Sequence, residues 1–180
     1  MDTLWAPWRM AFIAEDDAAR DERNALNNVQ VGENADPDCF LCQAVFDESR
    51  DKQRHVVCRT ELTVTVLNRF PYNNGHLLVA PRCHCGRLDQ LTDAEKSELL
   101  QEIDHWTSIL EKVMNPDGFN IGLNLGRSAG AGLPGHLHWH IVPRWNGDTN
   151  FITAVSSAKV IPQSLDALWE LLVRFSAETG

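Results

Sequence analysis

The stretch from His136 to Val142 constrains the fold more than any other part of this chain, because imidazole and apolar side chains alternate along it as far as Ile141. Successive side chains of a β-strand point to opposite faces of a sheet. The pattern therefore predicts a strand with His136, His138 and His140 on one face and the intervening apolar residues in a core. Three rings about 7 Å apart repel one another once protonated. This arrangement favours an unprotonated imidazole that acts as a nucleophile near neutral pH.

The alternation alone leaves two other interpretations open, because a half-exposed edge strand or a metal site made by all three rings would show it as well. The glycine-rich link before this strand favours a catalytic function. Gly126, Gly130, Gly132 and Gly135 let backbone N–H groups turn inward and form a nest for an anion. The amide of Asn124 can point the same way. A neutral imidazole beside a phosphate-binding loop predicts nucleotidyl transfer: the ring attacks phosphorus, and water or phosphate resolves the covalent phosphoramidate.

The rest of the chain predicts an antiparallel sheet and two helices. Strands are expected over 55–59, 63–67, 76–80, 119–125 and 136–142. Thr92 and Glu95 form a capping box that begins a long helix ending near Met114. Its apolar side chains recur at steps of four and three, at Leu99, Ile103, Trp106, Leu110 and Val113. A final helix is expected from Ser164. Strands joined by short links favour an α+β fold of about five antiparallel strands, with one long helix and a C-terminal helix.

A chain of 180 residues suits one ordinary domain. We expect an N-terminal anchor and acidic loop over 1–38, a core over 39–155 and a C-terminal helix over 156–180. The 16 Lys and Arg against 25 Asp and Glu give a formal charge of −9, which argues against a nucleic-acid or anionic-membrane binder. No apolar run long enough to span a bilayer and no secretory signal are recognised. An odd number of cysteines favours the reducing cytoplasm.

Cys39 and Cys42 have the spacing of half a zinc site, because thiolates three residues apart can reach one tetrahedral ion. A redox pair is the alternative interpretation. The partners must come from far along the chain, and His84 and His136 are the candidates. The cysteines on either side of His84 (Cys83 and Cys85) would point the opposite way on an extended chain, and they could serve in its place.

The alternating histidines resemble the signature of the histidine triad (HIT) superfamily of nucleotide hydrolases and transferases. Further segments carry the same resemblance in the same order: Leu4–Arg9, Asp38–Cys42, Leu67–His76, Phe119–Asn124 and Pro143–Phe151. The last of these resembles the bacterial branch described as diadenosine tetraphosphate phosphorylase-like. The resemblance covers roughly residues 4–155. It implies a HIT-like fold, a homodimer and an enzyme acting on a small-molecule nucleotide.

The resemblance also implies a role for individual residues. His138 would be the nucleophile that takes the nucleoside phosphate, and His140 would hydrogen-bond the phosphate or the bridging oxygen. His76 would steady the triad strand. Asn68 would hold the ribose hydroxyls, and Asn124 would bind phosphate together with the loop amides around Gly132. Apolar residues near Phe40 and Leu67 would sandwich the base.

The implied reaction is cleavage of a phosphoanhydride in a dinucleoside polyphosphate through a covalent nucleotidyl-histidine intermediate. No organic cofactor is implied, and a structural Zn²⁺ would bind Cys39, Cys42, His84 and His136. Leu133 stands where several branches place a Ser or Thr that touches the leaving group, so phosphorolysis and hydrolysis both stay open. The alternatives are a nucleotide-binding regulatory protein with little turnover and a zinc-organised module without pocket chemistry.

Overall fold

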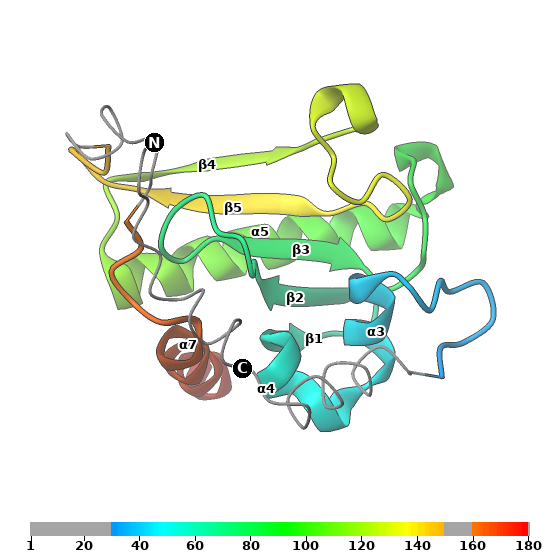
Figure 1. Cartoon of the computed structure of the whole chain (residues 1–180), viewed down its shortest axis with the longest axis horizontal. Helices are drawn as coiled ribbons and strands as arrows, with labels where there is room; N and C mark the ends of the chain where they lie inside the picture. The colour runs from blue at the N-terminus through cyan, green and yellow to red at the C-terminus, as the bar shows by residue number, and fades with distance from the viewer. Residues whose placement is uncertain (1–29, 150–159, 180) are drawn as a thin grey trace, which may run out of the picture.

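The computed structural model describes residues 30–149 and 160–179. Its centre is a five-stranded antiparallel sheet with the strand order β1-β2-β3-β5-β4 (Figure 1). The strands are β1 (Val56–Arg59), β2 (Thr63–Leu67), β3 (Leu77–Pro81), β4 (Gly118–Leu123) and β5 (Trp139–Arg144). The expected α+β class with about five antiparallel strands is confirmed.

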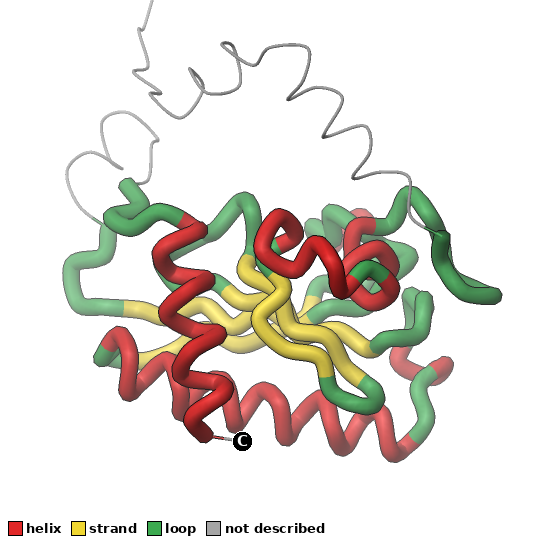
Figure 2. The backbone as a smooth tube through the Cα atoms, turned by 90° about the horizontal axis from the view of Figure 1, so that it is seen from below, coloured by secondary structure: helices red, strands yellow, loops and turns green. Residues whose placement is uncertain are grey.

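Helices cover both faces of this sheet. They are α3 (Phe40–Phe46), α4 (Asp51–Arg54), α5 (Asp93–Met114) and α7 (Leu165–Thr179), with short 3-10 turns at Glu48–Arg50, Leu88–Gln90 and Arg127–Ala129. Figure 2 shows α5 along one face and α3 with α4 on the other, while α7 packs beside β1 at the end of the sheet. Within the described ranges, no helix is both long and apolar enough to cross a membrane.

The long helix α5 forms where the sequence predicts it. The Thr92 hydroxyl accepts a hydrogen bond from the Glu95 backbone, and the Glu95 carboxylate accepts one from the Thr92 backbone, which satisfies two amides at the helix start. Asn115 adopts a left-handed conformation (φ 46°) and ends the helix. The helix predicted within 156–180 is α7. The predicted N-terminal anchor falls mostly in residues 1–29, outside the described residues.

Alternating side chains of the sheet fill two separate cores, as strand geometry requires. One core lies under α5 and α7, and it includes Leu67, Leu77, Val79, Trp106, Leu110, Leu137, Ile141, Leu168 and Leu172. The other lies under α3, and it includes Leu41, Ala44, Val45, Val64, Val66, Leu78 and Ala80. Leu78 pairs with His140 across β3 and β5. Because directly paired residues share a face of the sheet, His140 stands on the α3 side.

The last strand begins later than the alternation predicts, at Trp139 instead of His136. The β3–β5 register pairs Val79 with Trp139, so two positions further along Pro81 would oppose Leu137. Proline has no N–H to donate, which ends the ladder there. The Leu137 amide instead donates to the Cys85 carbonyl. The first two histidines of the triad therefore stand on an extended segment just before β5, and only His140 is on the strand.

Candidate active site and adjoining metal centre

Three histidine rings converge on the face of the sheet that α3 covers. His76 Nε2 lies 2.9 Å from His140 Nδ1, and the ring centroids of His138 and His140 are 5.1 Å apart. His76 directly precedes β3, and the antiparallel pairing of β3 with β5 places its ring beside that of His140. The structure thus brings together the three residues predicted to be catalytic.

Backbone contacts set which nitrogen of His140 carries its proton. The Tyr72 amide donates to His76 Nδ1 at 3.0 Å, so the proton of a neutral His76 is on Nε2. From there it donates to His140 Nδ1, which leaves the proton of a neutral His140 on Nε2. The end of the Asn124 side-chain amide lies 3.4 Å from that atom, and it accepts this proton when the amide presents its oxygen. His140 therefore presents an N–H donor to a group bound at the site.

His138 is held in the opposite tautomer. Its Nδ1 lies 2.8 Å from the backbone oxygen of His136. A carbonyl oxygen can only accept, so Nδ1 is the protonated nitrogen and Nε2 keeps its lone pair. An imidazole whose outer nitrogen is unprotonated and whose inner nitrogen is fixed by a hydrogen bond has the form that nucleophilic catalysis needs.

Burial keeps the surrounding rings neutral. Desolvation, followed by the nearby His140 and His138, lowers the pKa of His76 to about 3. Desolvation and the neighbouring His138 lower the pKa of His140 to about 4. Both groups are therefore uncharged at neutral pH. The hydrogen bonds from the Tyr72 amide to His76 and from His76 to His140 therefore keep the same donors and acceptors at neutral pH.

The two asparagines predicted to bind nucleotide flank the histidines. Asn68 follows β2, and its backbone amide donates to the His76 carbonyl at 2.9 Å, which closes the β2–β3 loop. Its side-chain amide lies 3.2 Å from His76 Nδ1. Asn124 follows β4 and reaches His140 as described above. Gly132 is exposed on the loop between β4 and β5. Among the described residues, no polar contact joins it to the histidines.

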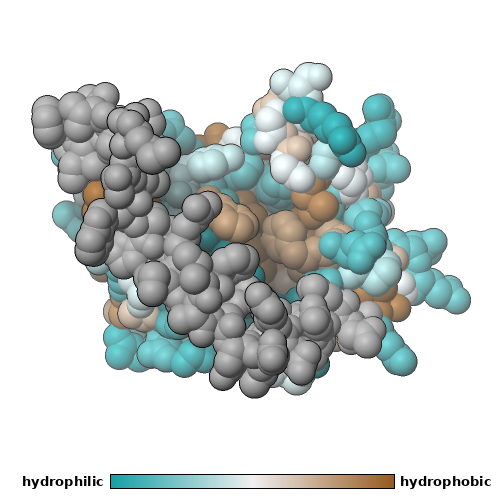
Figure 3. All heavy atoms as spheres, in the orientation of Figure 1, coloured by the Kyte–Doolittle hydropathy of each residue, from teal (hydrophilic) through white to brown (hydrophobic). Residues whose placement is uncertain are grey.

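One part of the predicted base-binding set lies on the wrong side of the sheet. Leu67 is buried in the core under α5, so it does not face the histidines. Its neighbour Val66 points to the α3 side instead, because adjacent strand residues face opposite ways. Phe40, at the start of α3, is 45% exposed. Figure 3 shows apolar surface gathered over the middle of the sheet on this same side.

A second cluster adjoins the triad. The ligand atoms of Cys39, Cys42, His84 and His136 all lie within 4.8 Å of one another. His136 Nδ1 is 3.3 Å from the sulfur of Cys39, and His84 Nδ1 is 3.2 Å from that of Cys42. Cys39 caps the first turn of α3, so the two thiols stand one helical turn apart on the same side.

The chemistry of this cluster fits a thiophilic cation. His136 Nε2 lies 2.8 Å from the Pro81 carbonyl and must donate to it, so the lone pair on Nδ1 is directed at the thiols. Burial raises the pKa of the Cys39 thiol to about 12. A thiolate at this position therefore needs a compensating positive charge, which a bound metal ion would supply.

The cysteines on either side of His84 do not join the cluster. The sulfurs of Cys83 and Cys85 lie 3.3 Å from each other and pack into the core under α5. On this extended segment His84 points the opposite way, toward α3. Of the two alternatives considered from the sequence, the structure brings only His84 to Cys39 and Cys42.

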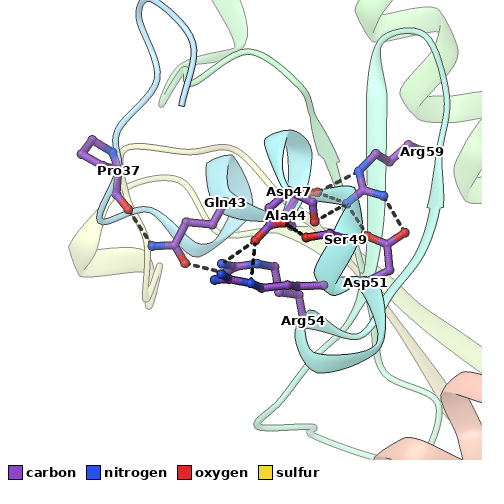
Figure 4. Close-up of polar contacts among 9 residues, drawn as sticks. Pro37, Gln43, Ala44, Asp47, Ser49, Asp51, Arg54 and Arg59 are labelled. Carbon is purple, nitrogen blue, oxygen red and sulfur yellow. Dashed lines mark hydrogen bonds and ion pairs between the residues drawn. The ribbon is translucent and has the colours of Figure 1, made fainter. Parts of the chain in front are cut away.

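Two arginines that sequence reasoning did not single out hold the far end of α3 (Figure 4). Arg59, from β1, donates to the Ala44 carbonyl at 2.8 Å and pairs with the Asp51 carboxylate. Arg54 donates to the Gln43 side chain and pairs with Asp47. Arg59 thereby satisfies a carbonyl at the end of the helix whose other end carries both thiols, and Arg54 adds a second positive charge near that end. The sequence signal for Arg59 was a charged residue at the end of an otherwise apolar strand.

Tyr72 was also missed from the sequence. Its ring stacks on that of His140, with centroids 5.6 Å apart and planes inclined by 24°. Its backbone amide supplies the hydrogen bond that begins the chain through His76. Its position four residues before His76, on a short loop, was the only signal in the sequence.

Comparison with known proteins agrees with this geometry. The sequence matches the HIT domain over residues 49–147. It is 41% identical over 165 residues to AP-4-A phosphorylase of Mycobacterium tuberculosis, covering 92% of this chain and 79% of that protein. It is 37% identical over 93 residues to the asymmetrical bis(5'-nucleosyl)-tetraphosphatase of Schizosaccharomyces pombe, covering 52% of this chain and 50% of that one.

A solved structure gives the same fold. A hypothetical histidine triad nucleotide-binding protein from Sulfolobus tokodaii superposes with a TM-score of 0.60 at 23% identity, covering 78% of this chain and 93% of that chain. Together with the sequence matches, this establishes the class of protein. The chain belongs to the HIT family, as the alternating histidines predict.

The lowered pKa values of His76 and His140 make stability depend on pH. The unfolded chain takes up protons at these rings below about pH 6.5, whereas the folded protein does not do so until about pH 4. The free energy of unfolding should therefore fall as the pH is lowered from 7 to 5. His76→Gln removes one of the titrating rings while keeping a donor and an acceptor. Urea denaturation should show a shallower fall for this variant, and equal slopes for both proteins would contradict the assignment.

Proposed function

We propose that this protein cleaves a phosphoanhydride bond of dinucleoside polyphosphates such as diadenosine tetraphosphate through a covalent nucleotidyl-histidine intermediate. The observation that carries the proposal is the pair of opposite tautomers: His138 with a free Nε2 lone pair and His140 with an Nε2–H. The names of two relatives, a diadenosine tetraphosphate phosphorylase and a bis(5'-nucleosyl)-tetraphosphatase, support the same substrate class.

In this reaction His138 Nε2 attacks the phosphorus next to the bound nucleoside. A P–N bond forms while the bond from phosphorus to the bridging oxygen breaks, and the Nε2–H of His140 hydrogen-bonds the oxygen that departs. Water or phosphate then attacks the same phosphorus, and the P–N bond breaks. We propose that Asn68 holds the ribose and that Asn124 with the loop amides around Gly132 binds phosphate oxygens, where fixed donors stabilise the developing charge.

The acceptor in the second step can be water or phosphate. The two named relatives differ in this respect, one being a phosphorylase and the other a hydrolase. Leu133 has no hydroxyl to offer the leaving group, and its side chain packs partly into the core under α3. Product analysis with and without phosphate separates the two reactions, because phosphorolysis incorporates phosphate into one product.

We expect the protein to convert diadenosine tetraphosphate to ATP and ADP if phosphate is the acceptor. If water is the acceptor, we expect AMP and ATP, because attack at the phosphorus next to the nucleoside releases AMP; two ADP would place the attack at the second phosphorus and contradict this step. His138→Asn should lower kcat by at least about 10³-fold, because it removes the attacking atom. Chromatography of the products and isothermal titration calorimetry measure turnover and binding separately.

His105→Asn on α5 is the matched control, and it should keep its turnover. Nucleotide binding without turnover in the unmodified protein would favour the alternative of a regulatory nucleotide-binding protein. Equal activity of the His138→Asn variant and the unmodified protein would overturn the proposed mechanism.

We also propose that the cluster of Cys39, Cys42, His84 and His136 binds a structural Zn²⁺. Four protein ligands leave no open coordination position, so the ion would stiffen the scaffold and take no part in the chemical steps. It would tie the start of α3 to the segment that carries the triad. The five cysteines are free thiols, which suits a reducing compartment such as the cytoplasm.

Zinc analysis tests this site. The purified protein should carry one zinc ion per chain, and both Cys42→Ser and His84→Ala should lose it. Chelation should lower the melting temperature, because the metal stabilises only the folded state. Cys83→Ser is the matched control and should retain the metal, since its thiol points into the other core. Loss of zinc from Cys83→Ser with retention in His84→Ala would overturn the ligand set.

We further propose that the protein is a homodimer formed through β4. This strand lies at the edge of the sheet, and no other described strand pairs with its outer side. Ile121, on β4, is 48% exposed. An exposed edge strand with an apolar side chain is a template for pairing with another strand, and a twofold axis would let two copies cover each other's β4.

Sedimentation velocity should therefore give a mass of about twice the 20.2 kDa of one chain. Ile121→Lys should shift the protein toward the monomer, because it places a charge in the dimer contact. Phe46→Lys, at the end of α3 and also exposed, should leave the mass unchanged. A dimer that survives Ile121→Lys and dissociates with Phe46→Lys would place the contact elsewhere.

A further inference from the structure

Two aromatic rings on the β2–β3 loop are exposed although the loop itself is well held. Phe70 is 81% exposed and Tyr72 is 54% exposed. They are two residues apart, with Pro71 between them. Neither ring belongs to one of the two apolar cores, so a role in packing the fold does not explain why aromatic side chains stand here. Adjacent exposed aromatic side chains are a common mark of a binding surface.

The backbone that carries these rings is fixed at several points. The Asn68 amide donates to the His76 carbonyl across the base of the loop, and the Phe70 amide donates to the Asn68 side chain at 2.9 Å. The buried Asn73 side chain donates to the Pro143 carbonyl at 2.9 Å and to Asp148 at 2.8 Å. The two rings therefore project from a preorganised loop, which lowers the entropic cost of binding a partner.

One of these rings, that of Tyr72, adjoins the histidine that faces the leaving group. Tyr72 stacks on His140, and in the proposed reaction His140 donates to the oxygen that departs. The nucleoside that stays attached to His138 is assigned to Asn68. The Tyr72 ring consequently lies beside the group that faces the departing oxygen, and Phe70 stands two residues before it on the same loop.

We infer that Phe70 and Tyr72 form a stacking platform for the nucleobase of the leaving nucleotide. This inference rests on the proposed function and adds a second base subsite to it. A dinucleoside polyphosphate carries a second purine on a flexible phosphate chain, which can fold back toward the loop. Every base has a π-face, and stacking on an aromatic ring suits it without requiring a particular base. The platform would distinguish dinucleoside from mononucleoside polyphosphates.

Equilibrium binding in the His138→Asn background tests the platform without turnover. Titration calorimetry compares diadenosine tetraphosphate with adenosine 5'-tetraphosphate, which lacks the second nucleoside. Phe70→Ala should weaken binding of the first compound about tenfold and that of the second by less than about twofold, since only the first can stack a distal base. Tyr72→Leu should show the same selective loss, and Tyr72→Phe should restore binding. Phe46→Ala, an exposed aromatic on α3, is the control and should change neither affinity.

Equal weakening of both compounds by Phe70→Ala, or no change in either, overturns the platform. A fall in sedimenting mass for Phe70→Ala also overturns it, because the rings would then be a subunit contact. Binding of neither compound overturns both the platform and the proposed function. Selective binding of diadenosine tetraphosphate that depends on Phe70, with no turnover by the unmodified protein, overturns the proposed function alone.

Discussion

Burial of Leu137 and Ile141 under α5 fixes the direction of all three triad histidines. Both side chains are almost wholly buried in the core beneath the long helix. Because successive residues on an extended chain face opposite ways, the intervening imidazoles must project on the α3 side. Exposing either apolar residue would cost a few kcal/mol. The orientation of the candidate catalytic groups is therefore a consequence of the hydrophobic core, and no local preference of histidine is needed.

Backbone groups then decide how the imidazoles are protonated. The His136 carbonyl accepts the inner proton of His138, and the Tyr72 amide starts the chain that puts the proton of His140 on its outer nitrogen. Backbone donors and acceptors do not titrate, so they select one tautomer of each neutral ring. Burial reinforces them by lowering the pKa of His76 and His140. Two chemically identical side chains are thereby given opposite roles.

The metal cluster and the triad share the same segment of chain. His136 faces the thiols of α3, and two residues later His138 faces the proposed substrate site. The helix that supplies the thiols is held at its other end by Arg54 and Arg59 (Figure 4). Fixing α3 in this way holds the thiols against His84 and His136. The candidate catalytic and metal sites thus share one short segment of chain that leads into β5, and both adjoin the same helix.

The sequence by itself determined the two faces of the histidine segment, the capped helix α5 and the spacing of the two thiols, because these depend on local periodicity. Only the tertiary structure decided that His84, and neither Cys83 nor Cys85, meets Cys39 and Cys42. It also decided that β5 begins at Trp139 and that Leu67 lies on the far side of the sheet. Each of these depends on strand register and on contacts between distant segments. A pattern of neighbours along the chain cannot encode them, since a shift of one residue in pairing would exchange the two faces.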